Sequence, residues 1–351
     1  MSQTMNANDL ANNPNFLLHL IDFQKGLFHF LEVTPETYRD SAFLDERLEH
    51  ASGNVFSVPY ADMARVAPML RKPEKRMNFL FHSAFCGSTL LSRCLTEPGV
   101  SFTLREPQAT LALANFKRTG GAAANAEFWP SFCDTTFNLL KKSYAPDEWV
   151  LVKPTNIVNN LLPEALAYSP ESKVLFLYAD LNDFLVSNLK KEDEAARKTI
   201  LFAKNFVMDS DYRQKFPELN LDALDTAQAA IVSWHSQMYA FTEMMKHEDQ
   251  NRIRTLYHED FLTDPKTTLA AAYAFYGTPL PEERIDAIVE GPLLKTNAKH
   301  ADQAYSPEQR AADKAAVQEK FQARIDAAMA WAKPMLDALP IPERLPLPLL
   351  G

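Results

Sequence analysis

Residues 83–89 combine small residues with two adjacent hydroxyls, a composition that suits the binding of an anion. A short apolar run, 79–81, precedes them, and an apolar pattern of helical spacing starts at Leu90 and Leu91. A strand, a tight turn and a helix N-terminus point free backbone N–H groups and the helix dipole at an anion. The sequence therefore predicts a phosphate-bearing nucleotide or cofactor here, bound by Ser83, Ala84, Phe85, Cys86, Gly87, Ser88 and Thr89. The alternative is a plain turn in which Ser88 only caps the helix.

This loop differs from the Walker A motif of ordinary nucleotide triphosphatases. That motif places a lysine between its last glycine and the Ser or Thr, and the lysine reaches the terminal phosphates. Here Ser88 follows Gly87 directly. A kinase-type alternative remains, because the apolar run 174–178 leads to Asp180, which could hold Mg²⁺. Dependence on Mg²⁺ would separate the two interpretations.

The elements around the loop alternate between apolar strands and helical stretches. Strands are expected at 79–81, 101–104, 149–152, 174–178 and 253–257, with helices near 88–96, 108–117 and 130–144 and a loop at 119–125. This order predicts an α/β fold, a three-layer arrangement with a central mostly parallel sheet and helices on both faces. Ligands of such sheets bind beyond the carboxyl ends of the strands. Those ends carry the loop 83–89, Arg105-Glu106, Lys153 and Ala179-Asp180.

Three regions are expected along the chain. Residues 1–75 form an N-terminal extension, with two short strands within 16–33 around Lys25-Gly26 and a helix over 35–50. Residues 76–335 form the α/β domain, mainly helical over 181–250, with a helix from 260–265 to 276 and another at 307–333. Residues 336–351 form a proline-rich tail, extended on the surface from residue 339.

Composition limits the classes of protein that the chain can represent. The formal net charge of −9 argues against nonspecific binding to nucleic acid or to an anionic membrane. Met1 to Asn15 lack a basic signal-peptide region, and no apolar stretch reaches the length of a membrane span. Three cysteines without metal-ligand spacing are typical of reduced thiols. We therefore expect a soluble cytoplasmic protein in which Cys86 is a small buried residue rather than a nucleophile.

Several segments resemble one family. Residues 81–93, Phe-His-Ser-x-x-Cys-Gly-Ser-Thr-Leu-Leu-Ser-Arg, resemble the phosphosulfate-binding loop of sulfotransferases that use 3′-phosphoadenosine 5′-phosphosulfate (PAPS), above all the bacterial members. Residues 183–189 resemble the segment that binds the donor's 3′-phosphate, and 253–265 resemble the late strand and its acidic-proline turn. These landmarks span about residues 77–277 in the expected order. The resemblance implies a P-loop NTPase-like fold, PAPS as donor, 3′,5′-ADP as product and no metal ion.

The resemblance also implies roles for individual residues. Glu106 would be the base on the acceptor, Lys153 would contact the transferring group, and Ser187 would contact the 3′-phosphate. His82 is a second candidate base beside the loop. Each role has a structural alternative: Glu106 paired with Arg105, a solvated Lys153, a helix-surface Ser187 and a core His82. The acceptor is expected to be a small molecule with a hydroxyl or an amine, selected near 115–130 and 190–225.

Two positions depart from the family pattern. Phe85 and Ala179 stand where the family usually has basic residues that bind the charged donor. Candidate replacements are Arg93, Arg105, Lys190, Lys295 and Lys299. The alternative is a protein of this fold that has lost donor use or binds another anionic ligand.

Overall fold

The structure is a computed structural model that describes residues 6–50, 53–70, 75–191, 193–298 and 306–351. The chain divides into two compact units. Unit 1 comprises Met1–Phe81, Leu91–Val174 and Tyr276–Thr278, and unit 2 comprises His82–Leu90, Leu175–Phe275 and Pro279–Gly351. Each unit is described by itself below. The expected division into extension, domain and tail stays a prediction.

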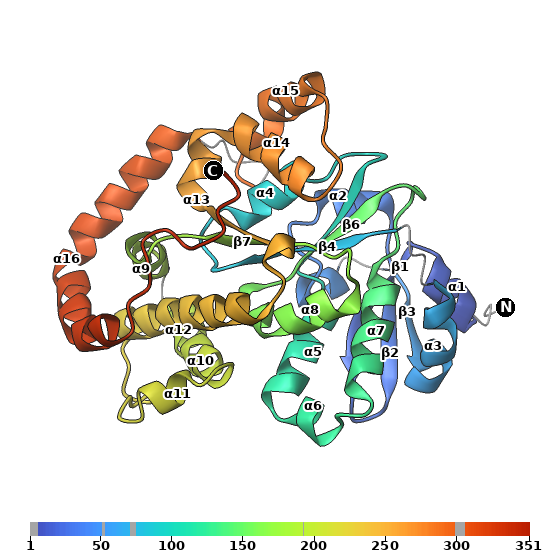
Figure 1. Ribbon diagram of the computed structural model, residues 1–351, viewed down its shortest axis with the longest axis horizontal. Helices are drawn as coiled ribbons and strands as arrows, with labels where there is room; N and C mark the ends of the chain where they lie inside the picture. Colours follow the sequence, from blue (N-terminus) through green and yellow to red (C-terminus); the bar gives the residue numbers. More distant parts are fainter. Residues whose placement is uncertain (1–5, 51–52, 71–74, 192, 299–305) are drawn as a thin grey trace. The chain divides into compact units, whose positions relative to one another are not determined.

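Five short apolar strands form the central sheet, in the order β5-β6-β4-β7-β8. They are β4 (Met77–His82), β5 (Ser101–Arg105), β6 (Trp149–Lys153), β7 (Val174–Tyr178) and β8 (Ile253–Tyr257). Every residue of β4 to β7 is buried, which suits the apolar runs of β4, β6 and β7. Strand β5 alternates polar and apolar residues, and its polar residues are buried as well. β4 and β5 each pair in parallel with β6. With helices on both faces of the sheet (Figure 1), the predicted α/β fold is confirmed.

Unit 1 also contains an antiparallel sheet near the N-terminus. Its strands are β1 (Phe16–Asp22), β2 (Leu27–Glu32) and β3 (Val55–Pro59), paired in that order. The two strands expected within 16–33 are therefore confirmed, whereas β3 was not foreseen. Two helices pack on β1, α5 (Gln108–Arg118) and α7 (Trp129–Leu140). Further elements of unit 1 are α1 (Ala7–Asn12), α3 (Tyr60–Val66), η2 (Ala67–Leu70), η3 (Asn156–Leu161) and α8 (Leu162–Tyr168). Helix α4 (Ser88–Cys94) begins in unit 2 and continues in unit 1 from Leu91.

The helix expected over 35–50 is wrong in its length. Helix α2 (Pro35–Asp40) starts with a capping box at Thr34 and ends after six residues, and η1 (Glu46–His50) follows separately. The guanidinium of Arg105 donates to the carbonyls of Tyr38 and Ser41, so these carbonyls have a partner outside the helix. Two smaller differences lie further along: a short helix, α6 (Gly121–Ala124), interrupts the expected loop, and α7 stops at Leu140.

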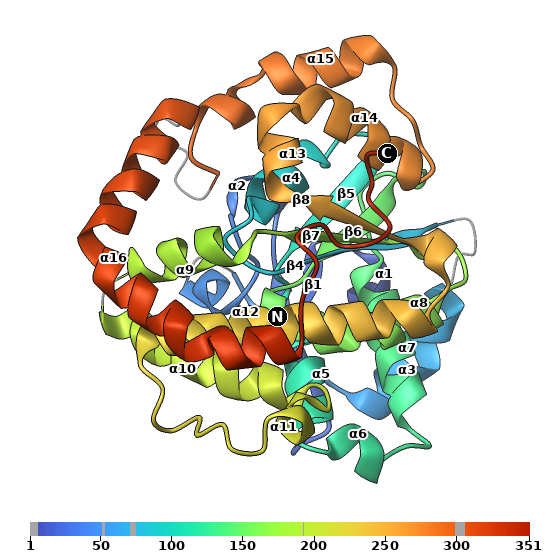
Figure 2. The same cartoon turned by 60° about the vertical axis from the view of Figure 1, so that its left-hand side comes forward.

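Unit 2 is mainly helical, as expected for 181–250. Its helices are α9 (Leu181–Leu189), α10 (Asp193–Met208), α11 (Tyr212–Lys215), α12 (Thr226–His247), α13 (His258–Thr263), α14 (Pro265–Phe275), α15 (Glu282–Glu290) and α16 (Pro307–Ala338), with η4 (Gln250–Arg252) and η5 (Pro292–Lys295). The long helix α16 packs against both α12 and α9 (Figure 2). None of the described helices combines the length and apolar composition that crossing a bilayer requires.

The C-terminal tail is extended, but it is not only a surface segment. The backbone N–H of Thr255 in β8 donates to Leu347 O at 2.8 Å, and Leu349 N donates to Thr255 O at 2.7 Å. Leu345 is buried. The tail therefore covers backbone groups along β8, which a proline-rich composition did not predict.

Candidate functional site

The loop Ser83–Thr89 of unit 2 has an unusual backbone. Ala84, Phe85 and Gly87 have φ angles of 73°, 54° and 77°, in the left-handed region that side chains disfavour. Hydrogen bonds anchor this loop to the end of β7. Ser83 N donates to Leu177 O at 3.0 Å, and Ser83 Oγ accepts from Ala179 N at 3.1 Å. The strained backbone is thus fixed at the end of a buried strand, where ligands of parallel sheets bind.

Three loop residues can be assigned from their contacts. Cys86 is fully buried and its thiol donates to Leu177 O at 3.5 Å, which favours the structural interpretation of this cysteine. Helix α4 begins at Ser88, so Gly87 precedes it and Ser88 is not its N-cap. His82 Nδ1 accepts the N–H of Ala84 at 3.0 Å. A neutral His82 then carries its proton on Nε2, which leaves it no lone pair for the predicted role as base.

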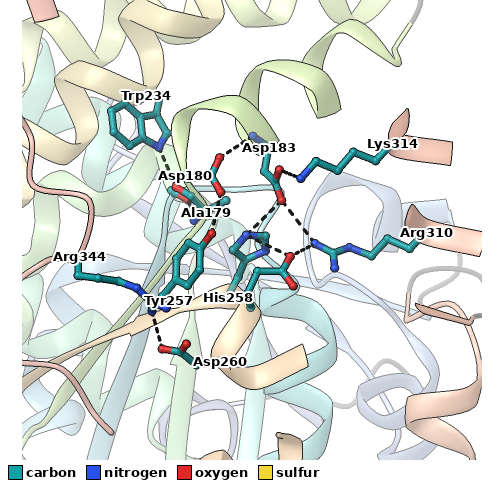
Figure 3. A network of polar contacts seen from close by, with 12 residues as sticks. Ala179, Asp180, Asp183, Trp234, Tyr257, His258, Asp260, Arg310, Lys314 and Arg344 are labelled. Carbon is teal, nitrogen blue, oxygen red and sulfur yellow. Dashed lines mark hydrogen bonds and ion pairs between the residues drawn. The ribbon is translucent and has the colours of Figure 1, made fainter. Parts of the chain in front are cut away.

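Helix α9 follows β7 and carries a dense network of charges (Figure 3). Asp183, in the first turn, is buried and forms ion pairs with Lys314 and with Arg310, the latter at 3.6 Å. Arg310 also binds Glu259 at 2.6 Å, and His258 Nε2 lies 3.3 Å from Asp183 Oδ2. Both cations come from α16. The network therefore joins the start of α9 to α13 and α16 through opposite charges.

The electrostatics of Asp183 follow from these contacts. Burial by itself raises the pKa of a carboxyl group, but hydrogen bonds from His258 and Lys314 outweigh it and lower the pKa of Asp183 to about 2. Asp183 is consequently ionised at neutral pH.

Asp180 caps α9 and uses both of its carboxylate oxygens within the fold. Oδ1 accepts from Asp183 N at 2.8 Å, and Oδ2 accepts from Tyr257 Oη at 2.7 Å. Side-chain atoms of Asp180, Asp183 and His258 lie within 4.8 Å of one another, a spacing that a metal ion could use. However, Lys314 and Arg310 already neutralise Asp183. These contacts argue against the Mg²⁺ role of Asp180 in the kinase alternative.

Ala179 and Ser187, two positions singled out by the family pattern, lie beside this network. Ala179 O accepts from the indole of Trp234 at 2.8 Å, so this tryptophan packs within the fold. Ser187 lies on α9 and is half-buried. Neither position brings a positive charge to the loop.

Two of the three lysines expected to replace the missing charges have partners elsewhere. Lys190 pairs with Asp313 at 2.6 Å, Lys295 donates to Glu290 O at 2.6 Å, and Lys299 lies outside the described residues. The ammonium of Lys191 instead lies 4.4 Å from the ring centroid of Phe85, inside the loop. The sequence did not single out this lysine.

In unit 1, Glu106 and Lys153 form an ion pair at the ends of neighbouring strands. Arg105 of β5 is opposite Lys153 of β6 in the parallel register, so Glu106 comes directly beyond the sheet edge. Glu106 has a φ of 55°, and its N–H donates to Lys153 O at 2.6 Å. Lys153 is 1% exposed at its side chain and Glu106 14%. A nearly buried lysine thus holds a carboxylate that keeps some access to solvent.

Arg105 is not the partner of Glu106, so the alternative in which these two residues pair does not hold. Its buried guanidinium donates to Ser41 O at 2.9 Å as well as to Tyr38 O. Burial, together with the nearby Arg93, lowers the pKa of Arg105 to about 9. Arg93 donates to Asp40 O at 3.2 Å. Both arginines therefore bind carbonyls at the end of α2, which argues against their use as donor contacts.

A separate cavity of about 630 Å³ lies in unit 2 between β8, α13 and the tail. Its lining includes Tyr178, Tyr257, Asp260 and Arg344. Arg344 binds Asp260 at 2.7 Å and lies 4.0 Å from the ring centroid of Tyr257. Its charge is therefore already matched within the cavity wall.

Sequence reasoning missed the cations of α16 as well as Lys191. Arg310 and Lys314 are four residues apart, so they lie on one face of the helix. That spacing was the available signal, but it does not identify the carboxylate that the face meets. Asp183 lies far from α16 in the sequence, and no periodic pattern relates it to the two cations.

A comparison with protein families finds one match, a model described as "Sulfotransferase domain", over residues 135–325. The match spans 191 of the 351 residues, which is more than half of the chain. It includes β6, β7, β8 and most of α16, whereas the loop 83–89 and Glu106 precede it. No curated protein matches the chain.

Solved structures resemble the chain at low sequence identity. The sulfotransferase domain from the curacin biosynthetic pathway is 13% identical, with 74% of this chain and 98% of that chain covered and a TM-score of 0.40. A sulfotransferase from Mycobacterium avium is 14% identical, with 76% and 80% covered and a TM-score of 0.40. A mouse sulfotransferase complexed with PAP is 11% identical, with 77% and 93% covered and a TM-score of 0.34.

Proposed function

Because this chain belongs to the sulfotransferase domain family, we propose that it transfers a sulfuryl group from PAPS to a hydroxyl or amine of a small-molecule acceptor. The observation that carries the proposal is the left-handed backbone of the loop 83–89, anchored on the end of β7. Such a backbone turns successive N–H groups toward a bound anion. The hydroxyls of Ser88 and Thr89 would add donors to the 5′-phosphosulfate.

The proposed reaction is an in-line displacement at sulfur. The acceptor oxygen or nitrogen forms a bond to sulfur while the bond from sulfur to the 5′-phosphate oxygen breaks. The leaving electron pair stays with 3′,5′-ADP, and the acceptor proton passes to the carboxylate of Glu106. Lys153, which forms an ion pair with Glu106, would stabilise the negative charge that develops during the reaction.

Ser187 would contact the 3′-phosphate of the donor, whereas His82 is assigned a structural role in the loop. The proposed step uses no metal ion. Transfer should therefore persist in the presence of a chelator, and loss of activity on chelation would favour the kinase alternative instead.

One observation favours a second candidate, a protein of this family that has lost or changed its donor. No Lys or Arg occurs within residues 83–89, and residue 179 is alanine. Each charge-assisted hydrogen bond to a phosphate contributes roughly 1.5–3 kcal/mol. Loss of two such bonds without replacement would abolish useful donor binding.

Calorimetric titration with 3′,5′-ADP distinguishes these candidates. We expect micromolar binding, weakened about tenfold or more by Ser88→Ala because one hydrogen bond to the phosphate is lost. Ser57→Ala, an exposed serine of β3, is the matched control and should bind as the wild type does. Binding should be followed by an assay of sulfuryl transfer from radiolabelled PAPS to phenols, alcohols and amines. A folded protein that shows no binding at millimolar 3′,5′-ADP would contradict the proposal.

A further inference from the structure

The cavity between β8, α13 and the tail has no part in the proposed reaction. Its volume of about 630 Å³ lies within the range of small-molecule sites in proteins. All of its walls belong to unit 2. Three leucines of the tail, Leu345, Leu349 and Leu350, line part of it. The cavity can therefore bury the apolar body of a small ligand.

The charged side chains in the lining are mostly acidic. The lining contains three acids, Glu259, Asp260 and Asp264, and one cation, Arg344. Arg344 binds Asp260 at 2.7 Å, as Figure 3 shows, and Arg310, from outside the lining, binds Glu259 at 2.6 Å. These two pairs are neutral, so Asp264 is the remaining side-chain charge of the lining.

Asp264 has no cation as a partner among the residues that the structure describes. Its Oδ1 accepts from Thr267 N at 3.0 Å, which caps the start of α14 and holds the carboxylate in place. Hydrogen bonds from Thr267 lower the pKa of Asp264, so it is ionised at neutral pH. Lys266, the closest lysine in sequence, binds Glu282 at 2.7 Å and Asp286 at 2.6 Å. The carboxylate of Asp264 can thus pair with a cation in the cavity.

Tyr178 brings a hydrogen-bond donor to the same cavity. It lines the cavity and is 3% exposed. Its hydroxyl oxygen accepts from Leu345 N at 2.9 Å and interacts with the donor groups of Arg344. The hydroxyl still has its own proton to donate, and within the described parts of the chain no group accepts it. Because a buried donor without an acceptor costs free energy, a ligand that offers an acceptor fits here.

We propose that this cavity binds a small molecule that combines a protonated amine, an apolar body and a hydrogen-bond acceptor. Asp264 pairs with the ammonium group, Tyr178 donates to the acceptor, and the leucines of the tail cover the apolar body. The site shares no residue with the proposed transfer reaction and does not depend on it.

The first test is a calorimetric titration of the full chain with 4-methoxyphenethylamine at pH 7 in an amine-free buffer. The methoxy oxygen of this probe accepts a hydrogen bond and cannot donate one. We expect a Kd below about 1 mM. The neutral analogue 2-(4-methoxyphenyl)ethanol should bind about fivefold more weakly, because it lacks the charge that pairs with Asp264. No binding of the amine by the folded protein, or equal binding of the alcohol, would overturn the proposal.

The carboxylate is tested with Asp264→Asn, which should weaken binding of the amine about fivefold. Asparagine retains the cap on α14 and loses only the charge. The matched control is Asp249→Asn, since Asp249 caps η4 in the same way through Asn251 N at 3.0 Å. This control should bind the amine as the wild type does. Equal affinities for the wild type and Asp264→Asn would refute the pairing with the ammonium.

The hydroxyl is tested with Tyr178→Phe and a second probe, phenethylamine, which lacks the acceptor. The variant should bind the methoxy compound about fivefold more weakly and phenethylamine with unchanged affinity. Because Tyr178 also accepts from Leu345 N, phenethylamine reports whether the cavity remains intact. An equal loss for both amines would mean that the hydroxyl acts through the tail, and no loss for either would mean that it does not contact the ligand. Both results would overturn its role as donor.

Discussion

In unit 1, the cationic groups of Arg105 and Lys142 donate hydrogen bonds to backbone carbonyls. In unit 2, those of Arg310 and Lys314 form ion pairs with carboxylates. Lys142 donates to Leu10 O at 2.8 Å and to Phe16 O. In contrast, Lys314 and Arg310 both bind Asp183. Carbonyl dipoles satisfy the hydrogen bonds of a cation without neutralising its charge. Carboxylates accept the hydrogen bonds of a cation and also neutralise its charge.

This difference gives the two units responses to pH of the same sign but in different pH ranges. Burial lowers the pKa of Lys142 to about 7, and burial together with the nearby Arg93 lowers that of Arg105 to about 9. In unit 2 the pKa of an acid, Asp183, is lowered to about 2. The carbonyl-bound cations thus weaken the fold at low pH, and the carboxylate network weakens as pH falls toward 2. Lys153 is intermediate in its choice of partner, since it lies in unit 1 but binds a carboxylate, that of Glu106.

The largest expected effect concerns that intermediate pair. Glu106→Gln should lower the rate of sulfuryl transfer by roughly 10²–10⁴-fold, because the amide cannot accept the acceptor proton. The dissociation constant for 3′,5′-ADP should change by less than about twofold, since the proposed role of Glu106 lies in proton transfer. Steady-state kinetics and calorimetry measure the two quantities. Glu127→Gln, an exposed control, should leave both unchanged, and full turnover by Glu106→Gln would refute its role as base.

The second effect concerns stability in unit 2. Asp183→Asn should lower the free energy of unfolding by about 2 kcal/mol at pH 7, because charge-assisted hydrogen bonds to Lys314 and His258 are lost. The pKa of Asp183 is lowered on folding, so its contribution is complete above about pH 4 to 5 and is lost as pH falls to 2. Denaturant titrations at pH 7, 5, 4 and 3 should show that the difference in free energy of unfolding between variant and wild type shrinks as pH falls.

The control for this prediction is Asp313→Asn, which breaks the exposed pair with Lys190. Exposed pairs contribute less than about 1 kcal/mol. Equal destabilisation by the two variants would mean that the network around Asp183 is no stronger than an ordinary surface pair, and the contrast between the units would fail.

The third effect is a slope of the free energy of unfolding against pH in unit 1. Between pH 7 and about 10 the unfolded chain holds a proton on Lys142 that the folded protein does not, so this residue makes stability rise with pH. The slope is at most about 1.4 kcal/mol per pH unit. Lys142→Met removes it, so the wild type should gain stability relative to this variant from pH 7 to 9 in denaturant titrations. Lys25→Met, at an exposed lysine, should follow the wild type at every pH, and parallel curves for Lys142→Met would contradict the prediction.

Local and strand-edge features could be predicted from the sequence. The apolar strands, the loop 83–89 and the pair of strand ends at Glu106 and Lys153 follow from patterns a few residues long and from the rule that parallel strands end at one edge. The helix over 35–50 could not be predicted correctly, because its end at Asp40 coincides with bonds from Arg105, about 65 residues later. Similarly, the prolines of the tail indicated an extended segment but did not show that its backbone pairs with β8.

The sequence by itself determined the five strands of the central sheet and which residues stand at the ends of those strands, because these properties depend on burial and spacing within each segment. Only the tertiary structure decided the partner of each charge. Lys153 meets Glu106, Lys314 meets Asp183, and Lys191 lies against the ring of Phe85. Partners in such pairs stand 47 to 131 positions apart, where no periodicity relates one residue to the other. Their choice depends on how helices pack, which the pattern of one segment does not contain.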